Sequence, residues 1–296
     1  MKTVAGIGEI LWDIFPERKA LGGAPANFAY HAAQFNLDSY VVSAIGKDSL
    51  GKEISDNLTE KKLKRLIEWT DYPTGTVQVT VNEAGIPRYE ICENAAWDNI
   101  PINRQTEELA RKCTAVCFGS LAQRSEISRN TIRRFLELVP SEAYKVFDIN
   151  LRGHYYTREI IHESLLQCNI LKINNEEVIE VAKLYDYKNL SKQEIGERLL
   201  KEYDLDIVVE TMGAIGSYVL TKSEISYIDT PGVQVADTVG AGDSFTGVFV
   251  AALLNGQSIR DAHRLAVDVS AYVCTQYGAM PKLPDTFKKQ IMTYEK

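Results

Sequence analysis

Two patterns in the sequence predict an α/β fold in which a mostly parallel sheet is covered by helices on both faces. Short apolar runs rich in β-branched residues recur along the chain, and longer stretches with helical periodicity separate them. Several of these longer stretches begin at Ser or Thr, residues that cap a helix N-terminus well. The predicted strands are Thr3–Gly8, Tyr40–Ile45, Ala115–Gly119, Lys145–Ile149, Ile170–Ile173, Ile207–Thr211 and Ser217–Leu220. The predicted helices are Ala24–Phe35, Ser49–Lys62, Ser125–Leu138, Thr157–Leu166, Glu176–Leu184 and Lys192–Tyr203.

One segment departs from this alternation of strands and helices. Between Thr76 and Glu93 two alternating strands follow each other directly, joined by a turn that contains Gly85 and Pro87. This pattern predicts a β-hairpin. Because open α/β folds bind ligands at the carboxyl ends of their strands, an inserted hairpin is a candidate lid over a site at that edge.

Composition excludes several classes of partner. The 296 residues carry a formal charge of −7, which argues against a surface that binds nucleic acid or a membrane face. The N-terminus lacks the pattern of a secretory signal, and no apolar run approaches a membrane span, so we expect a cytoplasmic protein. The five cysteines have no metal-ligand spacing, and we expect reduced thiols.

The most informative stretch is Asp237–Gly247, with the sequence DTVGAGDSFTG. An apolar run, Val248–Leu254, follows it and ends at Asn-Gly, as helices commonly do. The residues Gly240, Ala241 and Gly242 therefore lie at a helix N-terminus, where free N–H groups and the helix dipole can hold a phosphate. Asp243 in the first turn is then a candidate base that deprotonates a hydroxyl attacking that phosphate.

Simpler interpretations of this stretch exist. An aspartate in the first turn is a routine partner of the helix dipole, and a glycine pair before a helix is a routine turn. The glycines at 240, 242 and 247 imitate a dinucleotide-binding loop only loosely, because their spacing is wrong. The Gly-Lys-Ser/Thr ending of a Walker phosphate loop is absent.

The same stretch resembles the carboxyl-terminal signature of the ribokinase-like, or PfkB, family of sugar kinases. The segments GEILWD at 8–13 and GGAPANFA at 22–29 resemble the amino-terminal signature, in the form seen in bacterial-type fructokinases. Three further landmarks follow in order, FDINLR at 147–152, NNEE at 174–177 and TMGAIG at 211–216. The resemblance covers essentially the whole chain. It implies a three-layer α/β/α sandwich formed by one domain, residues 1–296, with a small β lid from about residues 9–19 and 71–98.

The resemblance also implies roles for single residues. It makes Asp243 the catalytic base, with the amides of Gly240, Ala241 and Gly242 as the anion hole. Sugar-site candidates are Asp13, Gly22, Gly23 and Asn27, together with Arg152 as a charge partner and Trp97 as a ring that stacks on the sugar. For Trp97 the alternative is packing in the core or the lid, and for Arg152 it is a surface salt bridge. Nucleotide-site candidates are Asn174, Thr211, Gly213, Gly216 and Gly242. Glu177 is a candidate Mg²⁺ residue acting through water, with helix capping as the alternative, and Asp237 is a candidate monovalent-cation ligand.

These assignments predict an ATP- and Mg²⁺-dependent sugar kinase, with K⁺ as an optional further cofactor. The glycine-rich segment at 22–27 carries no positive charge, which favours a neutral sugar, and D-fructose giving fructose 6-phosphate is the preferred reaction. Ribose, 2-keto-3-deoxygluconate and nucleoside kinases remain alternatives, as does a sugar-binding protein without catalysis. The edge strands of the lid make a homodimer through the lid a further expectation.

Overall fold

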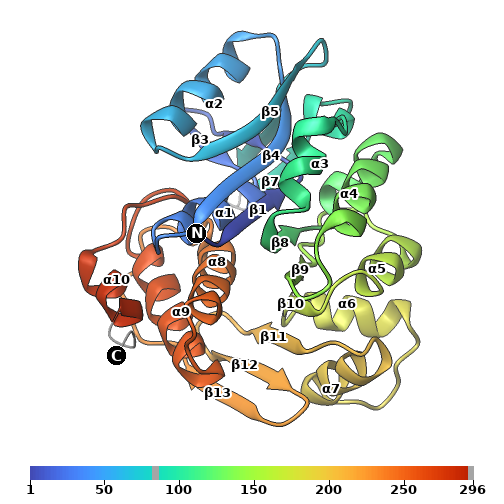
Figure 1. Ribbon diagram of the computed structural model, residues 1–296, viewed down its shortest axis with the longest axis vertical. Coiled ribbons are helices and arrows are strands. Elements are labelled where there is room, and N and C mark those ends of the chain that lie inside the picture. The colour runs from blue at the N-terminus through green and yellow to red at the C-terminus, as the bar shows by residue number, and fades with distance from the viewer. Residues whose placement is uncertain (82–86, 293–296) are drawn as a thin grey trace.

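The larger sheet of the computed structural model, which describes residues 1–81 and 87–292, has the predicted α/β character. Its strands lie in the order β13-β12-β11-β10-β9-β8-β1-β4-β5 (Figure 1). All neighbouring pairs from β11 to β5 are parallel, whereas β12 and β13 pair antiparallel. The strands are β1 Thr3–Ile7, β4 Asp38–Gly46, β5 Lys64–Thr70, β8 Cys113–Phe118, β9 Tyr144–Asp148, β10 Ile170–Asn174, β11 Ile207–Thr211, β12 Gly216–Thr221 and β13 Ile225–Asp229.

Helices cover both faces of this sheet, which confirms the predicted layers (Figure 1). One face carries α1 Ala24–Ala33, α2 Ser49–Glu60, α8 Ala241–Leu254, α9 Ile259–Cys274 and α10 Asp285–Met292. The other carries α3 Arg104–Ala110, α4 Glu126–Leu138, α5 Arg158–Leu165, α6 Glu177–Leu184 and α7 Lys192–Glu202. Side chains that alternate along the strands divide between the two cores, as Val4 and Ala5 of β1 do.

A second, smaller sheet stands apart from the main one. Its order is β3-β2-β6-β7, with β2 Leu11–Ile14, β3 Lys19–Gly22, β6 Gly75–Val81 and β7 Pro87–Ile91. The antiparallel pair of β6 and β7 confirms the predicted hairpin, while its turn lies outside the described residues. The strands β2 and β3 form a second hairpin, and β2 runs parallel to β6. Asp13 on β2 therefore belongs to this small sheet.

A buried arginine holds the small sheet to the main body. Arg124 pairs with Asp98 at 2.7 Å, and both side chains are less than a tenth exposed. Its guanidinium also donates to the carbonyl of Cys92, just after β7, at 2.7 Å, and lies 4.1 Å from the ring centroid of Trp97. An arginine that satisfies a carboxylate, a carbonyl and a ring together fixes where β7 leaves the main body.

The strand order places the carboxyl end of β1 at a switch point. β1 pairs with β4 on one side and β8 on the other, so connections leave it in both directions across the sheet. Ligands bind at such points in open α/β sheets. The loops after β1, β9, β10 and β11 all meet at this edge.

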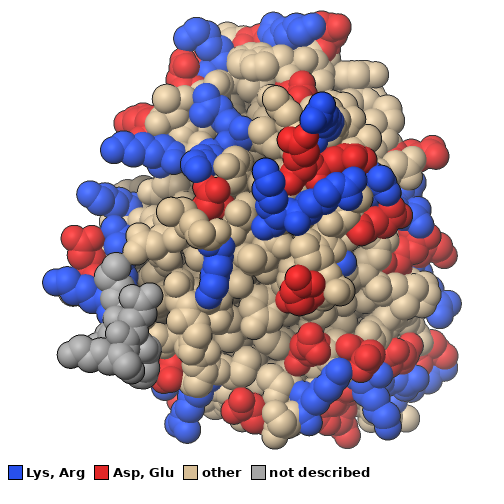
Figure 2. All heavy atoms as spheres, viewed as in Figure 1, with Lys and Arg blue, Asp and Glu red and all other residues tan. Residues whose placement is uncertain are grey.

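The exterior carries charges of both signs. Figure 2 shows acidic and basic side chains interspersed on the face in view. Among the described residues, no helix has the length and apolar character needed to cross a membrane.

Close packing of α1 on β1 gives a test of the fold. A Cβ at Gly6 would lie 2.0 Å from the carbonyl oxygen of Pro25, a backbone atom that cannot move alone. We expect Gly6→Ala to lower the free energy of unfolding by about 1–3 kcal/mol, measured by urea denaturation, because α1 must shift. A Cβ at Gly232 would meet nothing within 4 Å, so Gly232→Ala is the control and should change stability by less than about 0.5 kcal/mol. Equal stability of the two variants would contradict this packing.

Candidate active site

The N-terminus of α8 has the geometry predicted for an anion site. Gly240 is its N-cap, with a left-handed φ of 76°, and Asp243 lies in the first turn. A Cβ at Gly240 would lie 2.5 Å from the Cβ of Ala279, so both the backbone conformation and the space require glycine. No side chain caps this terminus, and its first amides can therefore receive an anion.

Asp243 is held by a residue far away in the sequence. The Nδ2 of Asn27 donates to Oδ2 of Asp243 at 2.7 Å, across 216 positions of the chain. Asn27 is 2% exposed, and α1 positions it because the helix begins immediately after Gly22-Gly23. Burial and the charge of Asp148 raise the pKa of Asp243, whereas the Asn27 hydrogen bond, Lys172 and Arg152 lower it. The predicted base is thus oriented and partly balanced by charge.

A buried lysine lies beneath the same turn. Lys172 on β10 donates from Nζ to Oδ1 of Asp148 at 3.0 Å, and a Cβ at Gly242 would lie 2.9 Å from that Nζ. Thr246 of α8 donates to the other oxygen of Asp148 at 3.2 Å. Although burial lowers the pKa of Lys172, the charges of Asp148, Glu177 and Asp243 raise it above its usual value, so the ammonium is held charged.

The sequence interpretation did not assign Lys172 or Asp148 a role. One signal was available, because a lysine inside the apolar strand Ile170–Ile173 must be paired if that strand is buried.

Two carboxyl groups follow β1. Burial raises the pKa of Asp13 to about 6, with Arg152 and Arg18 lowering it and Asp237 raising it. A Cβ at Gly22 would lie 2.8 Å from Oδ2 of Asp13, so the predicted sugar-site residues Asp13 and Gly22 are neighbours. Gly23 has a φ of 117°, and a Cβ there would lie 2.4 Å from the carbonyl oxygen of Glu9.

Glu9 itself was missed by the sequence interpretation. It is 2% exposed, its Oε2 has no hydrogen-bond partner, and Asn150 donates to its Oε1 at 3.5 Å. Burial raises its pKa to about 7, and the charge of Asp243 adds to the increase. An acid in an apolar segment before a predicted ligand residue was the available signal.

The predictions for Arg152 and Trp97 have different outcomes in the structure. Arg152 is exposed, forms no ion pair within residues 1–81 and 87–292, and lowers the pKa of Glu9, Asp13 and Asp243. It therefore lies near the site, and the surface salt bridge is not formed. The sugar-stacking prediction for Trp97 was wrong: its ring is 0% exposed, because Arg124 lies over it and Gly75 packs against its Nε1.

Asn174, the last residue of β10, and Glu177, the first residue of α6, hold the turn that leads into α6. The Oδ1 of Asn174 accepts from the N–H groups of Glu176 and Glu177, each at 2.9 Å. The carboxylate of Glu177, 5% exposed, accepts from the N–H of Asn174 at 2.8 Å and of Leu151 at 3.0 Å. These contacts match the alternative in which Asn174 and Glu177 cap the start of a helix. Direct ligation of Mg²⁺ by Glu177 does not fit these contacts, while an effect through water leaves them intact.

The remaining nucleotide candidates surround the turn between β11 and β12. Thr211 ends β11, Gly213 has a φ of 58°, and a Cβ on Gly213 would meet nothing within 4 Å. Gly216 begins β12, and a Cβ there would lie 2.7 Å from the carbonyl oxygen of Ile228. Gly213 thus leaves open space at the sheet edge, whereas Gly216 is required by the sheet itself.

Asp237 links two segments behind the anion turn. Its Oδ1 accepts from the N–H of Val239 at 3.1 Å and its Oδ2 from the N–H of Gly278 at 3.2 Å. Among the described residues, no three His, Cys, Asp or Glu side chains cluster in a way that could hold a metal ion. Any cation therefore needs ligands beyond these side chains, such as carbonyls or phosphates.

The chain is similar to known proteins over most of its length. Residues 16–286 match the model of the pfkB family of carbohydrate kinases. The chain is 29% identical over 283 residues to an ATP-dependent 6-phosphofructokinase of Thermoanaerobacterium thermosaccharolyticum, covering 90% of this chain and 83% of the relative. It is 25% identical over 298 residues to a fructokinase of Salmonella typhimurium, covering 94% and 95%.

Solved structures share the fold. A fructokinase variant from Vibrio cholerae, solved with fructose, ADP and a potassium ion bound, aligns with a TM-score of 0.82 at 23% identity over 98% of both chains. The similarity confirms the predicted ribokinase-like architecture. With the matched family model spanning most of the sequence, the chain belongs to the pfkB family of carbohydrate kinases, and it is a sugar kinase of that family.

Proposed function

We propose that this kinase phosphorylates free D-fructose with ATP to give fructose 6-phosphate, with Asp243 as the catalytic base. The observation that carries the proposal is the carboxylate of Asp243, fixed by Asn27 at 2.7 Å beside the uncapped amides that begin α8. A pure phosphate-binding turn gains nothing from a carboxylate, since the two charges repel. A turn that deprotonates an attacking hydroxyl needs one.

In the proposed reaction, the sugar hydroxyl gives its proton to the carboxylate of Asp243 as its oxygen attacks the γ-phosphorus. A new O–P bond forms, the bond between that phosphorus and the β,γ-bridging oxygen breaks, and ADP leaves with the bond's electron pair. Asn27 keeps one carboxylate oxygen in place, which leaves the other to accept the proton. The small sheet would cover the sugar and exclude water, so that the sugar and not solvent attacks.

Two groups would stabilise the negative charge on the transferred phosphoryl group, the amides at the start of α8 and the ammonium of Lys172. The free amides at the start of α8 would donate to the anion, and the ammonium of Lys172 lies under Gly242. Arg152 is an exposed cation close to the same carboxyl groups. Asn174 and Glu177 would hold Mg²⁺ through water, and the ion would offset part of the negative charge of the ATP phosphates. K⁺ near Asp237 would use lone pairs that its two N–H contacts leave free.

The sugar would bind between β2 and the start of α1. Asp13 can accept hydrogen bonds from two vicinal hydroxyls, and the absence of side chains at Gly22 and Gly23 leaves the backbone accessible. The family relatives include both fructokinase and 6-phosphofructokinase, so the family match supports a sugar kinase without deciding the sugar. The uncharged segment at 22–27 supports a neutral sugar.

A second candidate is a kinase of an already phosphorylated sugar. The 29% identity to a 6-phosphofructokinase and the exposed guanidinium of Arg152 near Asp13 favour it. It would use the same base and anion turn, so only the substrate distinguishes the two candidates.

Replacing the base tests the mechanism. Asp243→Asn should lower kcat by at least roughly a hundredfold, while ATP and sugar still bind, because the amide keeps the shape but cannot take the proton. The measurement is coupled ADP release together with calorimetric binding. Asp56→Asn, which removes an exposed carboxylate paired with Lys52 on α2, is the matched control and should leave kcat unchanged. Turnover near wild type in Asp243→Asn would rule out this role.

A substrate panel tests the sugar. With ATP, we expect kcat/KM for fructose to exceed that for ribose, 2-keto-3-deoxygluconate, adenosine and fructose 6-phosphate by tenfold or more, because no cation lies in the glycine-rich segment to hold a second phosphate. Initial rates of ADP release give the comparison. A preference for fructose 6-phosphate would replace the first proposal by the second candidate.

The raised pKa of Asp13 gives a pH test. Only the ionised carboxylate accepts two hydrogen bonds, and with a pKa of about 6 roughly one tenth of it is ionised at pH 5. The KM for the sugar should therefore rise about tenfold between pH 7.5 and pH 5 at saturating ATP. Asp13→Asn should raise KM and remove this dependence. A KM that still changes with pH in Asp13→Asn would assign the titration to another group.

A further inference from the structure

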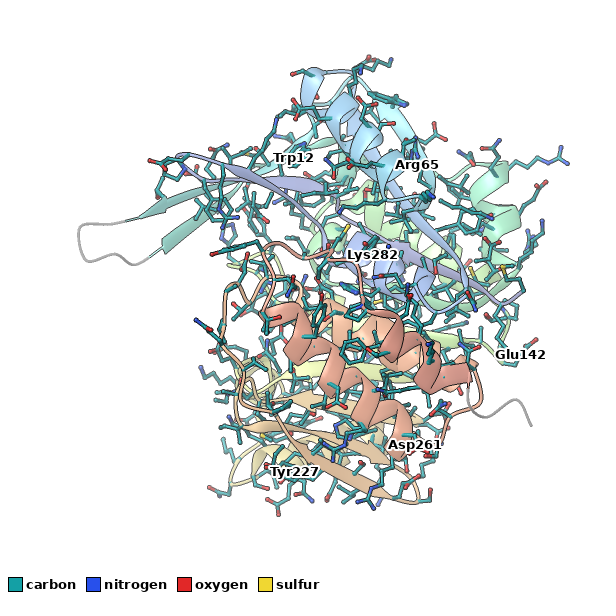
Figure 3. The ribbon with its side chains drawn as sticks, turned by 90° about the vertical axis from the view of Figure 1, so that its left-hand side faces the viewer. Trp12, Arg65, Glu142, Tyr227, Asp261 and Lys282 are labelled. Carbon is teal, nitrogen blue, oxygen red and sulfur yellow. The ribbon has the colours of Figure 1, made fainter. Side chains whose placement is uncertain are left out.

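A second cavity lies behind the β2–β3 hairpin. Its volume is about 290 Å³, and its walls come from that hairpin, from α2 and from the segment 277–280. Trp12, Arg18 and Lys19 line it from the hairpin, Asn57 and Lys61 from α2 and its C-cap, and Tyr277 from the third wall. Figure 3 shows Trp12 beside the N-terminal part of the ribbon and Lys282, in the segment that follows α9, nearer the C-terminal helices.

This cavity adjoins the proposed sugar site, because Ala20, the partner of Asp13 in the hairpin, and Arg18, whose charge acts on Asp13, also line it. In the hairpin Trp12 pairs with Leu21 and Ile14 with Lys19, whereas Asp13 pairs with Ala20. Neighbouring residues of a strand point to opposite faces, so Trp12, Leu21 and Lys19 share the face that Asp13 does not. Asp13 instead lies against Gly22.

Three positively charged side chains line the walls. Lys61 is partly buried, donates to the carbonyl of Met280 at 3.3 Å and forms no ion pair with any residue in 1–81 or 87–292. Burial lowers its pKa, although its neighbour Glu60 raises it. Arg18 is exposed, lies over the ring of Phe15 at 4.3 Å and likewise forms no ion pair in that part of the chain, although its charge lowers the pKa of Asp13. Lys19 is paired with Glu53 and lies over the ring of Trp12.

Two unpaired cations at one cavity attract a dianion. The ammonium of Lys61 meets a carbonyl and lies 5.2 Å from the ring centroid of Tyr30, but it has no carboxylate partner among the described residues, and an anionic ligand supplies a counter-charge. Tyr277, at the mouth, is 82% exposed and can add an apolar contact, whereas Trp12, 4% exposed, is part of the wall. The volume is near the lower limit for small-molecule sites, which suits a small phosphorylated metabolite better than a nucleotide.

We propose that this cavity is a second ligand site, which binds a small phosphate monoester with its phosphate between Lys61 and Arg18. The site touches the catalytic machinery on two sides. β2 carries both Trp12 and Asp13, and the third wall contains Gly278 and Ala279, which contact Asp237 and Gly240. Occupancy therefore restrains the sugar-binding strand and the anion turn together.

Calorimetry with glycerol 3-phosphate tests the site, in protein saturated with sugar and a non-hydrolysable ATP analogue so that the active site is filled. We expect one saturable binding event, weakened at least tenfold by Lys61→Gln and by Arg18→Gln. Lys61→Arg, which keeps the charge, should retain binding. Lys52→Gln on the same helix is the matched control, because Lys52 is exposed and paired with Asp56.

Thermal melting and the far-UV circular dichroism spectrum establish that each variant is folded. Absence of binding at millimolar glycerol 3-phosphate, or equal binding in the folded Lys61→Gln and Arg18→Gln double variant, would overturn the proposal. Equal binding of inorganic phosphate and of the ester would overturn the assignment to an ester. The substrate panel measures turnover, whereas this titration measures the affinity for glycerol 3-phosphate in an enzyme whose active site is filled. A failure of the fructose assignment therefore would not change the outcome of this titration.

Discussion

The buried ammonium of Lys172 is the interaction on which the site depends. Asp148, Glu177 and Asp243 all raise its pKa, so a single cation compensates a group of carboxylates at the carboxyl edge of the sheet. Without it, the remaining charges would be buried among like charges, and each carboxyl group would take up a proton at higher pH. A protonated Asp243 cannot act as a base. The lysine thus lowers the pKa of Asp243 and Glu177 against the effect of burial, and it also brings a positive charge beneath the anion turn.

Glycine residues allow the close helix packing that this arrangement of charges requires. Gly6 lets Pro25 of α1 approach β1, and Gly247 lets α8 approach α1, since a Cβ there would lie 2.7 Å from the carbonyl oxygen of Phe28. These two contacts set the separation of α1 from β1 and from α8, and the hydrogen bond from Asn27 to Asp243 follows from them. The geometry of the proposed active site is therefore a consequence of helix packing rather than of loop conformation.

The parts predicted from sequence were those with a local signal. β1, β8, β9, β10 and β11 are buried on both faces and appear as short β-branched runs, and the anion turn appears as glycines before an apolar run. β2, β3, β5 and β13 were not predicted, because their burial alternates or is partial and their pairing is set by distant strands. The same holds for side chains. Trp97 was misassigned because Arg124, which covers it, lies 27 positions later, and nothing local to Trp97 indicates that contact.

Net charge does not describe the local charge at the site, for a related reason. The total of −7 excludes a surface for long polyanions, but a charge in water acts over only about 8 Å at physiological salt. Within that range, Lys172 lies under the anion turn, Arg152 lies near three carboxyl groups, and Lys61 and Arg18 line one cavity without forming an ion pair among the described residues. Each of these cations lies beside a site that we propose for phosphate, while many of the acids elsewhere lie in exposed ion pairs. The composition therefore describes the surface that solvent sees, and the choice of ligand is made by a few cations whose positions depend on tertiary packing.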